Sequence, residues 1–407
     1  MLALMITRRT ALASLAAAPL LRGESQVTPF HVAIPKSKID HILRRVRETQ
    51  FPAALDAEDW RYGANWAYMK ELVAYWGSKY DWRKTEAQLN SFPQFMAKVG
   101  DYDIHFYHVK GKGPKPMPLI LTHGWPGSVV EFLESIGPLT DPASHGGRAE
   151  DAFDVVIPSL PGFGFSSKPK GKPAGPLTVS HLWHTLMTET LGYTKYGAQG
   201  GDWGGIITIR MAVENPRDLI GIHLNNATSR PAPEGGEPTA EGREWRTAAA
   251  AYSNRESAYA SIQGTKPQTV AFALADNPVG TAAWITEKLK VWSDSGNNIE
   301  SVFSKDQILA NVMLYLVTGT EATGVWIYRG NQDDVQGAKP RGRIMVPTGF
   351  MSSPKEMVNL HPPRPVLERD FNLTRYTEMP KGGHFAAFEQ PGPFVNEVRE
   401  FFRTVRG

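Results

Sequence analysis

Short apolar runs, each ending in glycine or proline and each followed by a helical pattern, recur between about residues 118 and 224. Runs of this length are predicted strands, and the segments between them, with apolar residues every three to four positions, are predicted helices. The strands are 118–122, 154–158, 196–199 and 219–224, and the helices are 129–136, 179–191 and 206–214. Alternating strands and helices form βαβ units, so the sequence predicts an α/β fold with a mainly parallel sheet and helices on both faces.

The alternation stops at about residue 225, and the pattern is then helical to about residue 342. Two more strands are predicted at 343–347 and 373–378, followed by a closing amphipathic helix. Ahead of the sheet, residues 30–116 are rich in tryptophan and tyrosine and predict helices with one strand at 104–109. The predicted organisation is a signal segment 1–25, an N-terminal region 26–100, a first core part 101–225, a helical lid 226–342 and a second core part 343–407.

Composition narrows the class of protein. The 407 residues carry 44 Lys and Arg against 41 Asp and Glu, a formal charge of +3. With 18 Phe, 13 Tyr and 11 Trp, the chain is neither disordered as a whole nor a nucleic-acid binder driven by bulk charge. The absence of cysteine excludes disulfides, thiolate nucleophiles and Cys-ligated metal centres.

The first 25 residues combine an arginine pair, Arg8 and Arg9, with an apolar run from Ala11 to Leu21. The run is shorter than the roughly 20 apolar residues that span a bilayer. It resembles a twin-arginine export signal, which predicts a bacterial periplasmic protein. The alternative is an amphipathic helix or a mis-assigned start on a cytoplasmic protein. No later segment reaches transmembrane length, so no transmembrane anchor is expected.

The central chemical motif is Gln199-Gly-Gly-Asp-Trp-Gly-Gly205, between a predicted strand and a predicted helix. Small residues around one reactive side chain are typical of a nucleophile elbow, a tight turn that lifts that side chain clear of the sheet. Here the lifted residue is Asp202. Glycines also surround acidic residues in many ordinary turns, so this motif alone does not establish catalysis.

Two further loops follow predicted strands. His123-Gly-Trp-Pro-Gly-Ser128 stands where an α/β-hydrolase places one oxyanion-hole N–H, the second coming from the residue after the nucleophile. By position these donors are Trp125 and Trp203. Gly382-Gly-His384-Phe follows the last strand, so the nucleophile, the acid and the histidine come in the order of an α/β-hydrolase fold.

The acid of this triad has several candidates. Glu356 follows the strand that ends at Pro347, which is where an α/β-hydrolase acid is expected, and such an acid would orient the imidazole of His384. Its rivals by distance along the chain are Glu368 and Asp370, whereas Asp333 and Asp334 lie too near the end of the helical insertion to be preferred.

From Phe30 to the C-terminus the chain resembles the epoxide hydrolases of the microsomal and juvenile-hormone type. The segments that carry the resemblance are 30–52, 123–128, 200–204, 262–268, 276–284, 311–315, 346–350 and 382–388. The first thirty residues depart from the pattern, because microsomal relatives begin with a membrane anchor.

The resemblance implies that Asp202 is the nucleophile and that Glu356 and His384 form the charge-relay pair. It also implies that Tyr259 and Tyr328 in the lid activate the epoxide. Tyr252 and Tyr315 are two other lid tyrosines to which it gives no role. The substrates would be a small apolar epoxide and water, without metal or organic cofactor and without nucleic acid, in a detoxification role. The N-terminal region would wrap the hydrolase domain. Oligomeric state stays undetermined.

Three other interpretations remain at this stage. A haloalkane dehalogenase would use the same aspartate but would not need two tyrosine acids. A binding protein could keep the hydrolase shell without turnover, although Asp202, Glu356 and His384 together argue against it. Residues 30 to about 100 could also form an independent binding module.

Overall fold

The computed structural model describes residues 27–55, 59–334 and 341–406, so the predicted export signal at 1–25 lies outside the described residues. Within these residues one sheet has the strand order β1-β2-β3-β5-β4-β6-β7-β8-β9. β1 to β3 join antiparallel to β5, and the strands from β5 to β9 run parallel. The bounds are β1 Thr28–Phe30, β2 Gln94–Val99, β3 Tyr102–Val109, β4 Met117–Thr122, β5 Phe153–Pro158, β6 Tyr196–Gly200, β7 Leu219–Leu224, β8 Ile344–Ser352 and β9 Phe371–Glu378.

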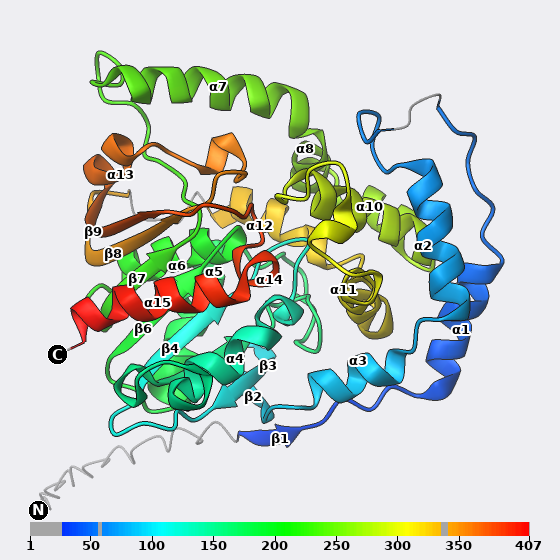
Figure 1. Ribbon diagram of the computed structural model, residues 1–407, viewed down its shortest axis with the longest axis horizontal. Coiled ribbons are helices and arrows are strands. Elements are labelled where there is room, and N and C mark those ends of the chain that lie inside the picture. The colour runs from blue at the N-terminus through cyan, green and yellow to red at the C-terminus, as the bar shows by residue number, and fades with distance from the viewer. Residues whose placement is uncertain (1–26, 56–58, 335–340, 407) are drawn as a thin grey trace, which may run out of the picture.

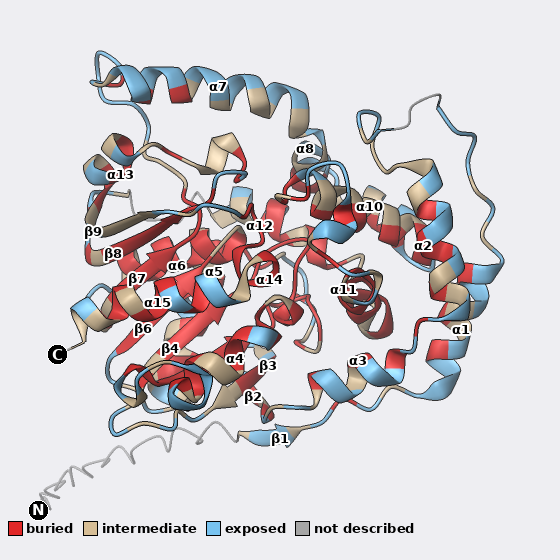
Figure 2. Ribbon diagram, in the orientation of Figure 1, coloured by how far each residue is buried: buried red, intermediate tan, exposed pale blue. Residues whose placement is uncertain are grey.

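Helices cover both faces of this sheet (Figure 1). Their bounds are α1 Lys36–Arg47, α2 Trp66–Ser78, α3 Trp82–Leu89, α4 Leu133–Thr140, α5 Pro176–Thr185, α6 Trp203–Glu214, α7 Ala240–Glu256, α8 Ala258–Thr265, α9 Pro267–Leu274, α10 Pro278–Val291, α11 Lys305–Thr318, α12 Ile327–Asp334, α13 Arg364–Asp370, α14 Ala386–Glu389 and α15 Pro391–Val405. The predicted α/β-hydrolase architecture is confirmed, and its core lies between the sheet and these helices, as the buried strands in Figure 2 show.

α5 and α6 pack on one face of the sheet, and α4 and α15 pack on the other. α15 approaches the strands closely because small residues face it. At Gly349 in β8, a Cβ would lie 2.6 Å from the ring of Phe401. A larger residue there would push the C-terminal helix away from the sheet.

The N-terminal region contacts both the sheet and the lid. β1 pairs with β2, and α1 and α2 contact α10 and α11. The sequence pattern predicted only one strand in this region, whereas the structure has β1 and β2 as well. β2 was missed because its buried and exposed positions do not alternate strictly.

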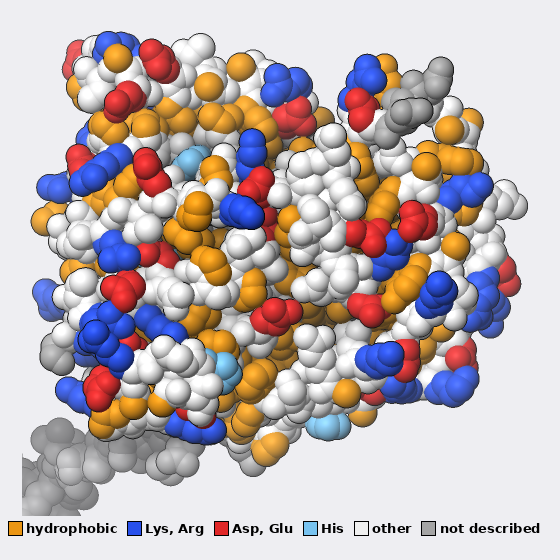
Figure 3. Space-filling model, viewed as in Figure 1, with side chains coloured by type: hydrophobic (Ala, Val, Ile, Leu, Met, Phe, Trp, Pro, Cys, Tyr) orange, Lys and Arg blue, Asp and Glu red, His pale blue; other side chains and the backbone are white. Residues whose placement is uncertain are grey.

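The part of the lid from α8 to α12 lies between the sheet and the N-terminal helices (Figure 1). α7 lies over α13 and the 3₁₀ helix Val358–Leu360, with most of its residues exposed (Figure 2). On the face shown in Figure 3, cationic and anionic side chains lie among one another. Among the described residues, every helix is too short or too polar to cross a membrane.

Candidate active site

Asp202 stands on the sharp turn between β6 and α6, with φ 52° and ψ −127°. Backbone in sparsely populated regions of this kind costs a non-glycine residue about 1–3 kcal/mol. Gly204 permits the close approach of helix to strand, because a Cβ there would lie 1.8 Å from the carbonyl oxygen of Thr122. The turn therefore presents the Asp202 carboxylate at the carboxyl edge of the sheet, with 13% of its side chain exposed.

One carboxylate oxygen is held by the loop after β4. Trp125 donates its backbone N–H to Oδ1 of Asp202 at 2.8 Å. Gly124 allows this contact, since a Cβ there would lie 2.2 Å from the same oxygen. Trp203 is the first residue of α6, where a helix leaves its N–H groups without intrahelical acceptors. Both predicted oxyanion donors therefore border Asp202.

His384 lies between two carboxylates. Its Nδ1 is 2.7 Å from Oε1 of Glu356, and its Nε2 is 3.3 Å from Oδ2 of Asp202. Burial alone would lower the pKa of His384, but the charges of Glu356 and Asp202 outweigh it and raise that pKa well above its ordinary value. The imidazole therefore holds a proton while Asp202 is charged, and releases it more readily once that charge is removed.

Glu356 is the candidate acid that contacts His384. β8 runs past the predicted end at Pro347 to Ser352, and the loop after it carries Glu356 inward with a fully buried carboxylate. The rival acids are engaged elsewhere: Asp370 with Arg230 and Arg369, Glu368 with Arg364, Asp333 with Arg329, and Asp334 with the N–H of Leu177.

The two predicted lid tyrosines contact each other and the tryptophans on either side of the nucleophile. The ring centroids of Tyr259, on α8, and Tyr328, on α12, are 5.8 Å apart, and the angle between the ring planes is 81°. Trp125 stacks on Tyr259 at 5.6 Å, and Trp203 meets Tyr328 at 4.7 Å. Burial raises the pKa of both phenols above its ordinary value, and the charge of Asp202 adds to the effect. Both hydroxyls therefore stay protonated and can donate. Tyr315, a lid tyrosine without an implied role, instead donates its hydroxyl to the carbonyl of Gly127 at 2.7 Å.

Asn226 is a site residue that sequence reasoning missed. Its Oδ1 accepts the backbone N–H of Asp202 at 2.9 Å, and its Nδ2 donates to Oε2 of Glu356 at 3.3 Å. It thereby ties the nucleophile turn to the acid. The available signal was its place two residues after the end of β7, at the same edge of the sheet as the other loops.

A cavity of about 20 Å³ lies among Asp202, His384 and Glu131. This is room for about one water molecule. Glu131, in the 3₁₀ helix Val129–Phe132, was also missed, because a single glutamate in a loop makes no pattern. Burial raises the pKa of Glu131 to about 8, so this carboxyl is neutral at neutral pH.

Across the described residues, no group of three or more His, Asp or Glu side chains is placed to hold a metal ion.

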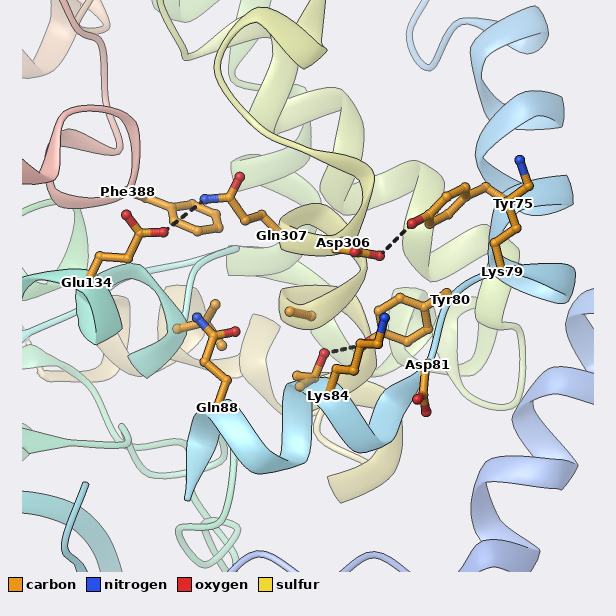
Figure 4. A pocket seen from close by; sticks show the side chains of 13 residues that line it. Tyr75, Lys79, Tyr80, Asp81, Lys84, Gln88, Glu134, Asp306, Gln307 and Phe388 are labelled. Carbon is orange, nitrogen blue, oxygen red and sulfur yellow. Dashed lines mark hydrogen bonds between the residues drawn. The ribbon is translucent and has the colours of Figure 1, made fainter. Parts of the chain in front are cut away.

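A second pocket, of about 160 Å³, lies among α2, α3, α11 and α14 (Figure 4). Charged side chains of both signs line it, including Lys79, Lys84 and Asp306, and Tyr75 donates to Asp306 at 2.9 Å. None of the five predicted catalytic side chains lines this pocket. Of these five, Asp202 and His384 line the smaller cavity described above.

Comparisons with known proteins agree with this geometry. The family model described as "Epoxide hydrolase N terminus" matches residues 27–132, and the one described as "alpha/beta hydrolase fold" matches residues 117–280. A putative epoxide hydrolase of Stigmatella aurantiaca is 42% identical over 93% of this chain and 86% of its own length. Epoxide hydrolase 1 of Oryctolagus cuniculus is 35% identical over 95% and 91%. The crystal structure of juvenile hormone epoxide hydrolase from Bombyx mori matches with a TM-score of 0.84 at 29% identity, covering 94% of this chain and 95% of that one.

Proposed function

The chain belongs to the epoxide hydrolase family, and from this membership we propose that it opens apolar epoxides to vicinal diols through an ester formed on Asp202. The observation that carries the proposal is the position of the Asp202 carboxylate. One of its oxygens accepts the Trp125 N–H, the other lies 3.3 Å from His384, and two protonated phenols stand on the lid side.

The first step forms the ester. Oδ1 of Asp202 is held by Trp125, so Oδ2 attacks the ring carbon from the face opposite the epoxide oxygen. The carbon–oxygen bond of the ring breaks, and its electron pair goes to the departing oxygen. Tyr259 and Tyr328 donate hydrogen bonds to this oxygen as its charge develops, and one of them supplies its proton.

The second step hydrolyses the ester. Esterification removes the negative charge of Asp202, which was one cause of the raised pKa of His384, so the imidazolium gives up its proton. That proton replaces the one that the tyrosine lost, and the neutral imidazole can then accept another. His384 takes a proton from water, and the hydroxide attacks the carboxyl carbon of Asp202. The N–H groups of Trp125 and Trp203 stabilise the oxyanion, each by about 3–4 kcal/mol. Collapse breaks the ester bond, and the proton on His384 passes to the leaving oxygen to give the diol. The Asp202 carboxyl then gives its proton to His384, which restores the starting carboxylate and imidazolium.

An aspartate suits this chemistry better than a serine would. A serine nucleophile would form an ether with the ring carbon, and water has no easy route to cleave an ether. The aspartyl ester presents a carbonyl carbon that an activated water can attack. The buried ring of Trp292, which contacts Tyr259, supports an apolar substrate, and we propose a role in detoxification from the family alone.

The proposal is tested by one turnover of styrene oxide with excess enzyme in heavy-oxygen water. Mass spectrometry then locates the label in the Asp202 peptide and in the diol. We expect label in Asp202 and an unlabelled diol, because water attacks the carboxyl carbon. Label only in the diol would mean that water opens the epoxide directly, and the role of Asp202 would be withdrawn.

We also propose that Arg8 and Arg9 belong to a twin-arginine export signal. A double Arg→Lys variant of this pair should retain the protein in the cytoplasm of a bacterial host. Fractionation followed by immunoblotting measures this, and unchanged periplasmic protein would refute it.

A further inference from the structure

The loop that carries His384 is held by the lid and by one buried acid. Gly382 N–H donates to Oδ2 of Asp294 at 3.1 Å, and His384 N–H donates to the carbonyl of Trp292 at 2.8 Å. Gly383 N–H and Phe385 N–H, on either side of the histidine, donate to the carboxylate of Glu389, both at 3.0 Å. Four consecutive backbone N–H groups are thus bound outside their own loop.

The same carboxylate reaches the lid. Oε2 of Glu389 also accepts the N–H of Asp294 at 2.9 Å. Asp294 lies in the segment that follows α10, and the Trp292 ring of this segment contacts both Tyr259 and His384, each with centroids 5.2 Å apart. Glu389 therefore joins the base, the histidine loop and the lid segment beside an epoxide-activating tyrosine.

We propose that Glu389 is a positioning residue for the ester hydrolysis step, which rests on the function proposed above. Burial raises the pKa of Glu389 to about 7, against the N–H groups of Asp294 and Phe385, which favour the charged form. Above pH 7 the three backbone N–H bonds to this carboxylate are therefore charge-assisted, and such bonds are shorter and stronger than neutral ones. They set the direction in which His384 presents Nε2 to the ester on Asp202. Glu389 touches neither substrate nor Asp202, so epoxide opening does not depend on it.

The position of α14 explains how this arrangement forms. α14 is a single helical turn immediately after the histidine loop, and it packs against α15, α4 and the 3₁₀ helix Val129–Phe132. Only 7% of Glu389 is exposed. Because α14 is anchored on three sides, its last residue gives the loop a fixed point of attachment.

The test variant is Glu389→Gln, which keeps the shape but offers one acceptor oxygen where the carboxylate has two. The NH₂ group of the glutamine, which cannot accept a hydrogen bond, would face either the N–H of Phe385 or the two N–H groups of Gly383 and Asp294. Since a misplacement of about 1 Å costs up to about 100-fold in rate, we expect ester hydrolysis to slow about 10- to 100-fold. Formation of the Asp202 ester should stay within about twofold of wild type. Rapid quench with styrene oxide and intact-protein mass spectrometry measures both steps, and the variant should accumulate ester.

Glu397→Gln is the matched control. Glu397 is as buried as Glu389 and accepts two hydrogen bonds from Arg375, which the substitution to glutamine weakens. It does not contact the histidine loop. This variant should lose stability without accumulating ester. If Glu389→Gln does not fold, Asp294→Asn, which alters the acceptor of the Gly382 N–H, should accumulate ester to a smaller degree. Equal slowing of both steps by Glu389→Gln, or hydrolysis at the wild-type rate, would overturn the proposal.

Hydrogen exchange separates this inference from the proposed function. In Glu389→Gln, peptides that contain residues 383–385 and residue 294 should exchange about tenfold faster than in wild type and in Glu397→Gln. Unchanged exchange there would show that Glu389 does not hold the loop. If wild type forms no ester, the proposed function fails, and the exchange result still decides whether Glu389 holds the loop.

Discussion

Replacing Glu356 by Gln tests the link between the buried acid and the base. Oε1 of Glu356 faces two donors, Nδ1 of His384 and the N–H of Met357, both at 2.7 Å. Oε2 faces the amide nitrogen of Asn226 at 3.3 Å. A glutamine has one oxygen for these three donors. If its oxygen serves His384, its NH₂ group faces the NH₂ of Asn226, which cannot flip without losing the bond to the Asp202 N–H.

The expected magnitude follows from the lost charge. A hydrogen bond to a charged group contributes about 1.5–3 kcal/mol, which is about a 10- to 150-fold change in rate. We expect the Asp202 ester to hydrolyse more slowly by this factor, and by up to about 10⁴-fold if the imidazole adopts the wrong tautomer. Ester formation should change less than threefold, because Asp202 keeps its contact with Trp125.

The assay is rapid quench with styrene oxide across a pH series, with intact-protein mass spectrometry to follow the ester. The charge of Glu356 raises the pKa of His384, so its removal lowers that pKa. The acid limb of the hydrolysis step should therefore move to lower pH in the variant. Parallel loss of both steps, or an acid limb that does not move, would refute the reasoning.

Three further predictions concern the tyrosines, a buried acid and the elbow. Tyr259→Phe and Tyr328→Phe should each lower kcat/KM for styrene oxide by about 100-fold, and the double variant by up to about 10⁴-fold; turnover of a haloalkane that survives both changes would favour a dehalogenase. Burial raises the pKa of Glu131 to about 8 from 4.5, so its contribution to stability is present below pH 4.5 and is lost as the pH rises to 8. Glu131→Gln should remove this loss, up to about 1.4 kcal/mol per pH unit by urea unfolding, and identical pH dependence in both proteins would contradict it. Gly204→Ala would drive a Cβ into the carbonyl of Thr122 and should cost about 3 kcal/mol or more in the same assay, where an unchanged midpoint would refute the close approach.

The sequence predicted the parallel part of the sheet because its strands are continuous apolar runs between glycines and prolines. The antiparallel edge was harder to predict, since β2 alternates poorly and is stabilised by pairing with β1 and β3. Propensity along the chain does not report pairing between distant segments.

The site residues also divide into those that a local sequence pattern predicts and those that only the tertiary arrangement reveals. Asp202 and His384 stand in loops with a recognisable glycine pattern, and the structure brings them together with Glu356. Asn226 and Glu389 act through backbone N–H groups of other loops. Which N–H groups a side chain reaches depends on the tertiary arrangement, so the sequence pattern gave no sign of their partners.

The three-residue strand β1 has a consequence for how the protein behaves when crowded. In the described part of the chain β1 forms one border of the sheet, and its middle residue is Pro29, which has no N–H to offer. A long strand with free N–H and C=O groups would be a template for another chain, whereas a short strand that contains proline is a poor one. β1 therefore shields the six-residue β2 from edge-to-edge aggregation.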